Sequence, residues 1–125
     1  MKLQEQTDEI FFNIGHKLKN TFPLDLYGCQ QPQFRKLTGR TKLHTDNIFI
    51  DTDKNNLHTR AMSVIIALND YEGGEFYFPI QKKTIKLKKG QAITFPPYWT
   101  HPHEVSEPQN GTVRYTINTW LLGGS

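Results

Sequence analysis

Residues 60–68 read RAMSVIIAL, and this apolar run is the best guide to the fold. It is rich in valine and isoleucine, which is typical of a β-strand. Short runs of the same kind lie on both sides of it: QFRKL at 33–37, KLHT at 42–45, NIFI at 47–50, EFYFP at 75–79, TIKLK at 84–88, QAITF at 91–95 and TVRYTINTWLL at 112–122. Turn-forming residues such as TG, EGG and QNG separate these runs, so most of the chain is predicted to be β-structure.

One helix is predicted before the strands, over Thr7–Asn20, and Pro23 is expected to end it. Its apolar residues recur on one helix face: Ile10, Phe11, Ile14 and Leu18. About eight short strands after a single helix predict a mainly β protein, an antiparallel sandwich or barrel of the jelly-roll type.

The composition is that of a globular protein with a single domain over residues 1–125. Hydrophobic residues make up 36% and charged residues 22%, which excludes a disordered chain. No apolar run approaches the roughly 20 residues of a membrane helix. No secretory signal is evident either, so a cytoplasmic location is expected. Cys29 is the only cysteine, which excludes a disulfide framework and a thiolate metal cluster.

The net charge of +3 and the pI of about 9.0 favour an acidic partner without identifying one. Lysines concentrate in KKTIKLKKG at 82–90, where Ile85 and Leu87 alternate with Lys86 and Lys88. This alternation predicts a strand with one apolar face and one solvated face. No aromatic residues are interleaved for base stacking, so a nucleic-acid site is not indicated.

The segment KLHTDN at 42–47 contains a candidate pair of metal ligands. Residues i and i+2 of a strand share a face, so His44 and Asp46 are expected to point the same way. A third histidine from a distant strand would complete the 2-His-1-carboxylate triad that non-haem Fe(II) uses. The His-x-Asp pattern is weak by itself, because a surface histidine beside an aspartate is its commoner explanation.

A second cluster, WTHPHEV at 99–105, supplies candidates for that third ligand. The strand that follows it is expected to present Arg114, Thr116, Asn118 and Trp120 on one face. An arginine on an inward face needs a partner once it is removed from water. A ligand carboxylate suits it, because the planar guanidinium binds such a group through two hydrogen bonds.

Several segments, in this order, resemble the Fe(II)- and 2-oxoglutarate-dependent dioxygenases, and within them the prolyl 4-hydroxylase-like branch. They are HTDN at 44–47, RAMSVIIALND at 60–70, YEGGEFYF at 71–78, LKKGQAITFPP at 87–97, and HPHEV through RYTINTW at 101–120. The resemblance implies a double-stranded β-helix, a cupin-like barrel, which agrees with the strand count.

By this resemblance, His44, Asp46 and His103 bind the iron. His101 is the rival of His103, and a cupin-like pattern of Gly90, Pro96 and His101 would favour it. The HEV segment favours His103.

The resemblance also assigns Arg114 to the distal carboxylate of 2-oxoglutarate, with the Thr116 hydroxyl as a second donor. Many relatives carry a tyrosine for the same carboxylate at the position of Ala67. Its absence implies either weaker cosubstrate binding or another residue in its role.

The implied reaction is the oxidative decarboxylation of 2-oxoglutarate by dioxygen, coupled to hydroxylation of a substrate C–H bond. Asp46 favours hydroxylation over halogenation, since a small residue there would open a halide position. Fe(II), 2-oxoglutarate and O2 are the implied cofactor and cosubstrates, and ascorbate is left open.

A prolyl residue of a peptide or protein is the favoured substrate. Trp99, Tyr98 and Trp120 are expected either to line its pocket or to pack in the core. The chain is expected to be a monomer or a homodimer. Two alternatives remain: a cupin-like metalloenzyme that does not use 2-oxoglutarate, and a non-catalytic binding module on the same fold.

Overall fold

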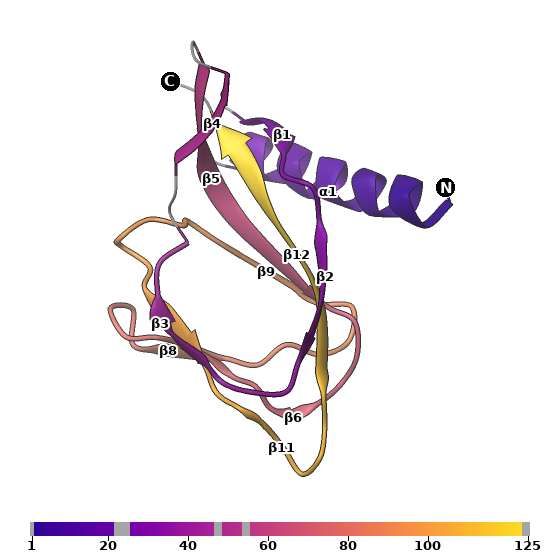
Figure 1. Ribbon diagram of the computed structural model, residues 1–125, viewed down its shortest axis with the longest axis vertical. Helices are drawn as coiled ribbons and strands as arrows, with labels where there is room; N and C mark the ends of the chain where they lie inside the picture. The colour runs from indigo at the N-terminus through magenta and orange to yellow at the C-terminus, as the bar shows by residue number, and fades with distance from the viewer. Residues whose placement is uncertain (1, 22–25, 47–48, 54–55, 124–125) are drawn as a thin grey trace.

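The computed structural model describes residues 2–21, 26–46, 49–53 and 56–123, in which one helix precedes twelve strands (Figure 1). The elements are α1 (Lys2–Thr21), β1 (Leu26–Cys29), β2 (Gln33–Leu37), β3 (Thr41–His44), β4 (Phe49–Asp53), β5 (Asn56–Ala67), β6 (Glu72–Gly73), β7 (Phe76–Phe78), β8 (Lys83–Ile85), β9 (Ala92–Phe95), β10 (His103–Val105), β11 (Pro108–Gln109) and β12 (Arg114–Gly123).

The strands form two main antiparallel sheets and one short two-stranded ladder. In the larger sheet the order is β1-β12-β5-β4, with β2 also paired to β12 and β9 to β5. The smaller sheet has the order β3-β10-β7-β8, and β11 pairs with β6. One apolar cluster joins the two main sheets, because it contains Ile65 and Phe95 of the larger sheet and Phe76 and Val105 of the smaller. The predicted mainly β fold, a double-stranded β-helix with one N-terminal helix, is confirmed.

The two long strands, β5 and β12, are covered on both faces. On β5, Ile65 and Ala67 belong to the cluster between the sheets, whereas Met62 and Val64 pack with the helix. This double burial explains why the RAMSVIIAL run is almost continuously apolar instead of alternating.

Helix α1 lies across the outer face of the larger sheet, beside β1 (Figure 1). Phe11 is its main anchor: the side chain is 1% exposed and packs with Leu26, Val64 and Leu121. Burial of such a ring contributes about 1.5–3 kcal/mol. The helix begins at Lys2, five residues before the predicted Thr7, and ends at Thr21. Pro23 and the first two residues of NIFI lie outside the described residues.

The predicted strands are confirmed in type but differ in extent. QFRKL matches β2 residue for residue, and RAMSVIIAL lies in β5, which begins earlier, at Asn56. The strand predicted over TIKLK at 84–88 was wrong in its second half, because β8 ends at Ile85. The alternation still holds in its burial, since Leu87 is buried while Lys86 and Lys88 are exposed. Short strands with little periodicity, such as β1 and β6, were not predicted.

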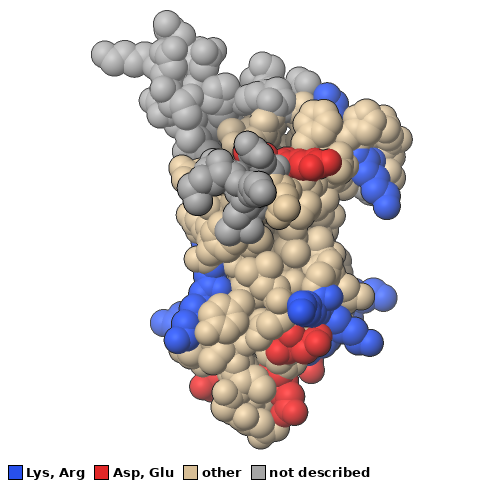
Figure 2. Space-filling view, turned by 90° about the vertical axis from the view of Figure 1, so that its right-hand side faces the viewer, with Lys and Arg blue, Asp and Glu red and all other residues tan. Residues whose placement is uncertain are grey.

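Basic side chains do not form a continuous surface on the face in Figure 2, where Lys and Arg are interleaved with acidic and uncharged residues. The lysines of residues 82–90 are exposed, which agrees with their interpretation as solvated. Within the described residues, α1 is not apolar enough to cross a membrane.

Candidate metal and cosubstrate site

Two histidines from distant parts of the chain meet because β3 pairs with β10. His44 ends β3, His103 begins β10, and the two are direct partners in the ladder. Their ring centroids are 4.4 Å apart. The pairing therefore joins the two predicted ligand clusters.

Both imidazole rings are oriented by hydrogen bonds to main-chain carbonyl groups. The Nδ1 atom of His44 lies 2.7 Å from the Lys42 oxygen, and that of His103 lies 3.1 Å from the His101 oxygen. A carbonyl oxygen only accepts, so each Nδ1 carries the proton. In the neutral form of each ring, Nε2 then carries the lone pair that a metal ion would use.

The carboxylate of Asp46 is held between these rings and two donors from the larger sheet. Its Oδ2 atom accepts hydrogen bonds from Ser63 Oγ at 2.7 Å and from Trp120 Nε1 at 3.1 Å. Its Oδ1 atom faces the histidines, 2.9 Å from Nε2 of His44 and 3.5 Å from Nε2 of His103. Hydrogen bonds to Oδ2 therefore orient the carboxylate, and Oδ1 can serve as the metal-binding atom.

The electrostatics keep this carboxylate ionised. Burial raises the pKa of Asp46, but hydrogen bonds with His44 and Ser63 oppose burial, and the pKa is lowered to about 2. Burial lowers the pKa of His103, which favours the neutral ring. The hydrogen bond with Asp46 raises the pKa of the more exposed His44, so without a metal ion this ring favours its protonated form. A metal ion on Nε2 would displace that proton, because an anionic oxygen and a neutral imidazole are the forms that bind metals.

The donor atoms of His44, Asp46 and His103 all lie within 4.8 Å of one another. Two imidazole nitrogens and one carboxylate oxygen are the donors of the facial triad, which suits Fe(II) and leaves coordination positions open. His101 is outside this group: its ring meets Phe78 edge-on and its Nδ1 lies 2.8 Å from Thr100 Oγ1.

The three candidate ligands open into a cavity of about 280 Å³. Arg114 lines it from the start of β12, with its side chain 3% exposed. Its guanidinium carbon lies 5.4 Å from the centre of the Phe76 ring. The other lining residues include Gln33, Arg35, Leu37, Arg60, Ile65, Val105, Asn118 and Trp120.

The hydroxyl group of Thr116, expected to donate to 2-oxoglutarate, forms a hydrogen bond with a neighbouring side chain of the same strand. Its hydroxyl donates to Asn118 Oδ1 at 2.6 Å, and Asn118, not Thr116, is among the lining residues. Both side chains are buried on the inward face of β12, as strand alternation predicted, and the role of the Thr116 hydroxyl as a donor to 2-oxoglutarate stays a prediction.

The aromatic candidates divide into one inside the cavity and two outside it. Trp120 lines the cavity and donates to Asp46. Trp99 is 78% exposed, and neither it nor Tyr98 lines the cavity. The exposure of Trp99 also excludes the core-packing interpretation for that residue.

Two arginines of the cavity were missed by sequence reasoning. The guanidinium of Arg60 stacks on the Trp120 ring at 3.6 Å, donating to the Asp46 main-chain oxygen at 2.9 Å and to Gln30 Oε1 at 2.7 Å. Arg35 lies 5.8 Å from the centre of the same ring and is held by Gln33. Strand alternation offers a signal for Arg35, because it shares one face of β2 with Gln33 and Leu37, and all three line the cavity.

Ala67 is fully buried and pairs with Thr116. It lies in the cluster between the sheets with Ile65, which lines the cavity. Residue 67 therefore faces the barrel interior, as the strand register assumed for its family position requires.

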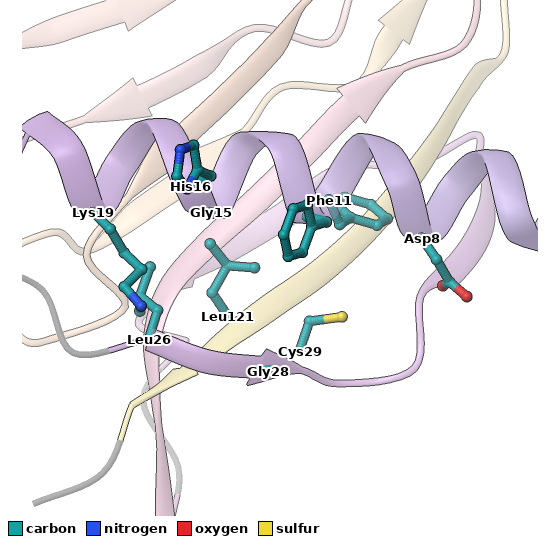
Figure 3. A pocket seen from close by; sticks show the side chains of 10 residues that line it. Asp8, Phe11, Gly15, His16, Lys19, Leu26, Gly28, Cys29 and Leu121 are labelled. Atoms are coloured by element: carbon teal, nitrogen blue, oxygen red, sulfur yellow. The ribbon is translucent and has the colours of Figure 1, made fainter.

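A larger cavity, about 400 Å³, lies between α1 and β1 (Figure 3). Phe11, Leu26 and Leu121 form its apolar wall, and Asp8, His16 and Cys29 stand at separate points around it. No group of convergent metal ligands occurs there among the described residues. The smaller cavity is therefore the candidate functional site.

A double-stranded β-helix with two histidines and one carboxylate facing a cavity defines the class of non-haem Fe(II) oxygenases. Residues 32–122 match the family model of the 2OG-Fe(II) oxygenase superfamily. The chain belongs to this family, for which Fe(II), 2-oxoglutarate and O2 are the cofactor and cosubstrates.

Solved structures of prolyl hydroxylases have the same fold. The viral collagen prolyl hydroxylase of Paramecium bursaria Chlorella virus-1, in its 2OG complex, is 24% identical with a TM-score of 0.78, over 95% of this chain and 72% of the other. A Pseudomonas putida prolyl-4-hydroxylase is 19% identical with a TM-score of 0.72, over 97% and 65%. A Trichoplax adhaerens prolyl hydroxylase, in complex with a hypoxia inducible factor peptide fragment, is 20% identical with a TM-score of 0.56, over 77% and 44%. A comparison with proteins of curated function found no match.

Proposed function

We propose that this oxygenase hydroxylates a prolyl residue of a peptide or protein, with iron on His44, Asp46 and His103 and with 2-oxoglutarate held by Arg114. The convergence of two Nε2 atoms and one Oδ1 atom beside a buried arginine carries this proposal.

Each residue has a role that follows from its surroundings. The two histidines and Asp46 would hold Fe(II), which supplies the activation of dioxygen and the oxidative decarboxylation of 2-oxoglutarate. Ser63 and Trp120 orient Asp46 through the oxygen that points away from the histidines. Arg114 offers a buried positive charge for the distal carboxylate, in a setting where a charge-assisted hydrogen bond is strong.

The substrate part of the proposal rests on two observations. The similar structures are prolyl hydroxylases by name, and one was solved with a peptide. In addition, the His44 side chain is 40% exposed, so the ligand group is accessible from outside on that side. A side chain presented by a flexible peptide would approach the metal there.

Two successive measurements test the proposed function. Addition of Fe(II) and 2-oxoglutarate without oxygen should produce the visible charge-transfer band of the chelate, and His103→Ala should abolish it. Oxygen and short proline-containing peptides should then yield succinate and a peptide heavier by one oxygen atom.

The outcomes separate the alternatives. Metal binding without the charge-transfer band would favour a cupin-like metalloenzyme, which needs no carboxylate clamp. A band without succinate formation, with or without peptide, would favour a non-catalytic binding module. Turnover with other substrates but not with proline peptides would contradict the prolyl substrate and leave the oxygenase activity in place. A cytoplasmic location stays a prediction.

A further inference from the structure

Two buried polar atoms have no hydrogen-bond partner in the described part of the chain: the hydroxyl oxygen of Tyr71 and the Nε atom of Arg114. Their side chains are 6% and 3% exposed. Buried polar groups are nearly always paired, so each unpaired atom calls for an explanation. One of these atoms is a hydroxyl oxygen that can accept, and the other is an N–H group that can only donate.

The two side chains are neighbours across Gly74. A Cβ atom added to this glycine would lie 2.6 Å from Tyr71 Cε2 and 3.3 Å from Arg114 Cδ. Gly74 also has a φ of +60°, which disfavours other residues. The second glycine of the EGG turn therefore allows the tyrosine ring to pack beside the arginine.

Lys86 also holds the ring of Tyr71. The ammonium group lies 4.1 Å from the ring centre and donates to the main-chain oxygens of Tyr71 and Gly73. Phe76 contacts the guanidinium of Arg114. Tyr71 is thus held in place without help from its own hydroxyl group.

The electrostatics of the pair are complementary. Burial lowers the pKa of Arg114, and Tyr71 opposes this shift. Burial raises the pKa of Tyr71, and the charge of Arg114 opposes it. The groups therefore interact, although their atoms do not meet the geometry of a hydrogen bond.

We propose that Tyr71 is a positioning residue for Arg114: its hydroxyl accepts from Nε–H when the distal carboxylate of 2-oxoglutarate binds, and so directs the terminal amino groups into the cavity. A bidentate contact depends on the plane of the guanidinium, which this hydrogen bond sets. Tyr71 does not line the cavity, so it acts through Arg114 and not on the ligand. The inference rests on the proposed function. This hydrogen bond would compensate for the tyrosine donor that many relatives carry at the position of Ala67.

The test is Tyr71→Phe, which keeps the ring against Gly74 and Lys86 and removes the hydroxyl alone. The dissociation constant of 2-oxoglutarate is measured without oxygen by the charge-transfer band. We expect roughly two- to tenfold weaker binding, the effect of one net hydrogen bond. Fe(II) affinity should not change. Tyr115→Phe is the matched control, because Tyr115 is exposed on the same strand as Arg114.

A second ligand distinguishes a role of Tyr71 in positioning Arg114 from a general role in packing. 2-Oxopentanoate has the same chelating end as 2-oxoglutarate but a methyl group in place of the distal carboxylate. Tyr71→Phe should bind it as the parent does. The effect of Tyr71→Phe on 2-oxoglutarate should also vanish in an Arg114→Lys background, because coupled residues are not additive.

Three results would overturn the inference. Equal 2-oxoglutarate affinity in parent and Tyr71→Phe would show that the hydroxyl does not assist Arg114. Equal losses for both oxo acids would show a structural role instead. A parent protein that binds Fe(II) but not 2-oxoglutarate would remove the proposed function, and the inference with it.

Discussion

Replacement of Ser63 by alanine tests whether Asp46 is a metal ligand that the larger sheet orients. The Ser63 hydroxyl donates to Asp46 Oδ2 at 2.7 Å in a buried environment. Hydrogen bonds to charged groups contribute about 1.5–3 kcal/mol. Alanine leaves Trp120 as the remaining side-chain donor, at the longer distance of 3.1 Å.

Metal affinity should fall as a result. With one donor missing, the carboxylate rotates more freely and its Oδ1 atom is held less firmly toward the two Nε2 atoms. The expected loss is roughly 10- to 100-fold, the usual effect of removing a group that orients a metal ligand. Titration with Fe(II) or Mn(II) without oxygen, in competition with a chromophoric chelator, measures this loss directly.

Thr119→Val is the matched control for Ser63→Ala. Thr119 is also fully buried and its hydroxyl donates to the main-chain oxygen of Gln30 at 2.7 Å, but it is not among the donors to Asp46. Both variants should lose stability, whereas only Ser63→Ala should lose metal affinity. A folded Ser63→Ala protein with the metal affinity of the parent would refute the reasoning.

The remaining predictions concern the other parts of the site. His103→Ala should abolish metal binding and His101→Ala should retain it in the same titration; the reverse result would assign the third ligand to His101, as in cupins. Arg114→Lys should weaken 2-oxoglutarate binding roughly tenfold or more at unchanged metal affinity, because an ammonium group does not reproduce two parallel hydrogen bonds; equal affinity would make Arg114 a structural residue. Ala67→Tyr should lower the free energy of unfolding by about 1–3 kcal/mol, since residue 67 is fully buried among packed side chains. A tyrosine variant as stable as the parent in urea unfolding, with tighter 2-oxoglutarate binding, would instead show that the site has room for the phenol.

Strand alternation correctly predicted which side chains share a face of a strand. On β12 it assigned Arg114, Asn118 and Trp120 to one face, and all three line the cavity. The same alternation places Ser63 and Ile65 of β5 on one face, where Ser63 donates to Asp46 and Ile65 lines the cavity. This success has a local cause, because side chains of a strand alternate whatever the strand pairs with.

Non-local contacts could not be predicted in this way. The proximity of His44 and His103 depends on the pairing of β3 with β10, which no local pattern encodes. The hydrogen bond between Thr116 and Asn118 depends on side-chain rotamers. The exposure of Trp99 depends on the course of the loop that carries it. Tyr71 lies between β5 and the two-residue strand β6, outside the predicted strands, so alternation gave no reason to relate it to Arg114. These features follow from tertiary packing, which overrides local propensity.

The two covered faces of β5 and β12 also govern how this protein tolerates insertions and deletions. Loss of one residue within β12 would move every following side chain to the opposite face. Isoleucine and leucine side chains that now contact the helix would enter the cavity, and Asn118 or Trp120 would be pressed against Phe11 and Val64. Point substitutions, by contrast, reach one face at a time. A substitution at an inward position of these strands therefore alters the cavity while the helix-facing positions continue to hold the fold together.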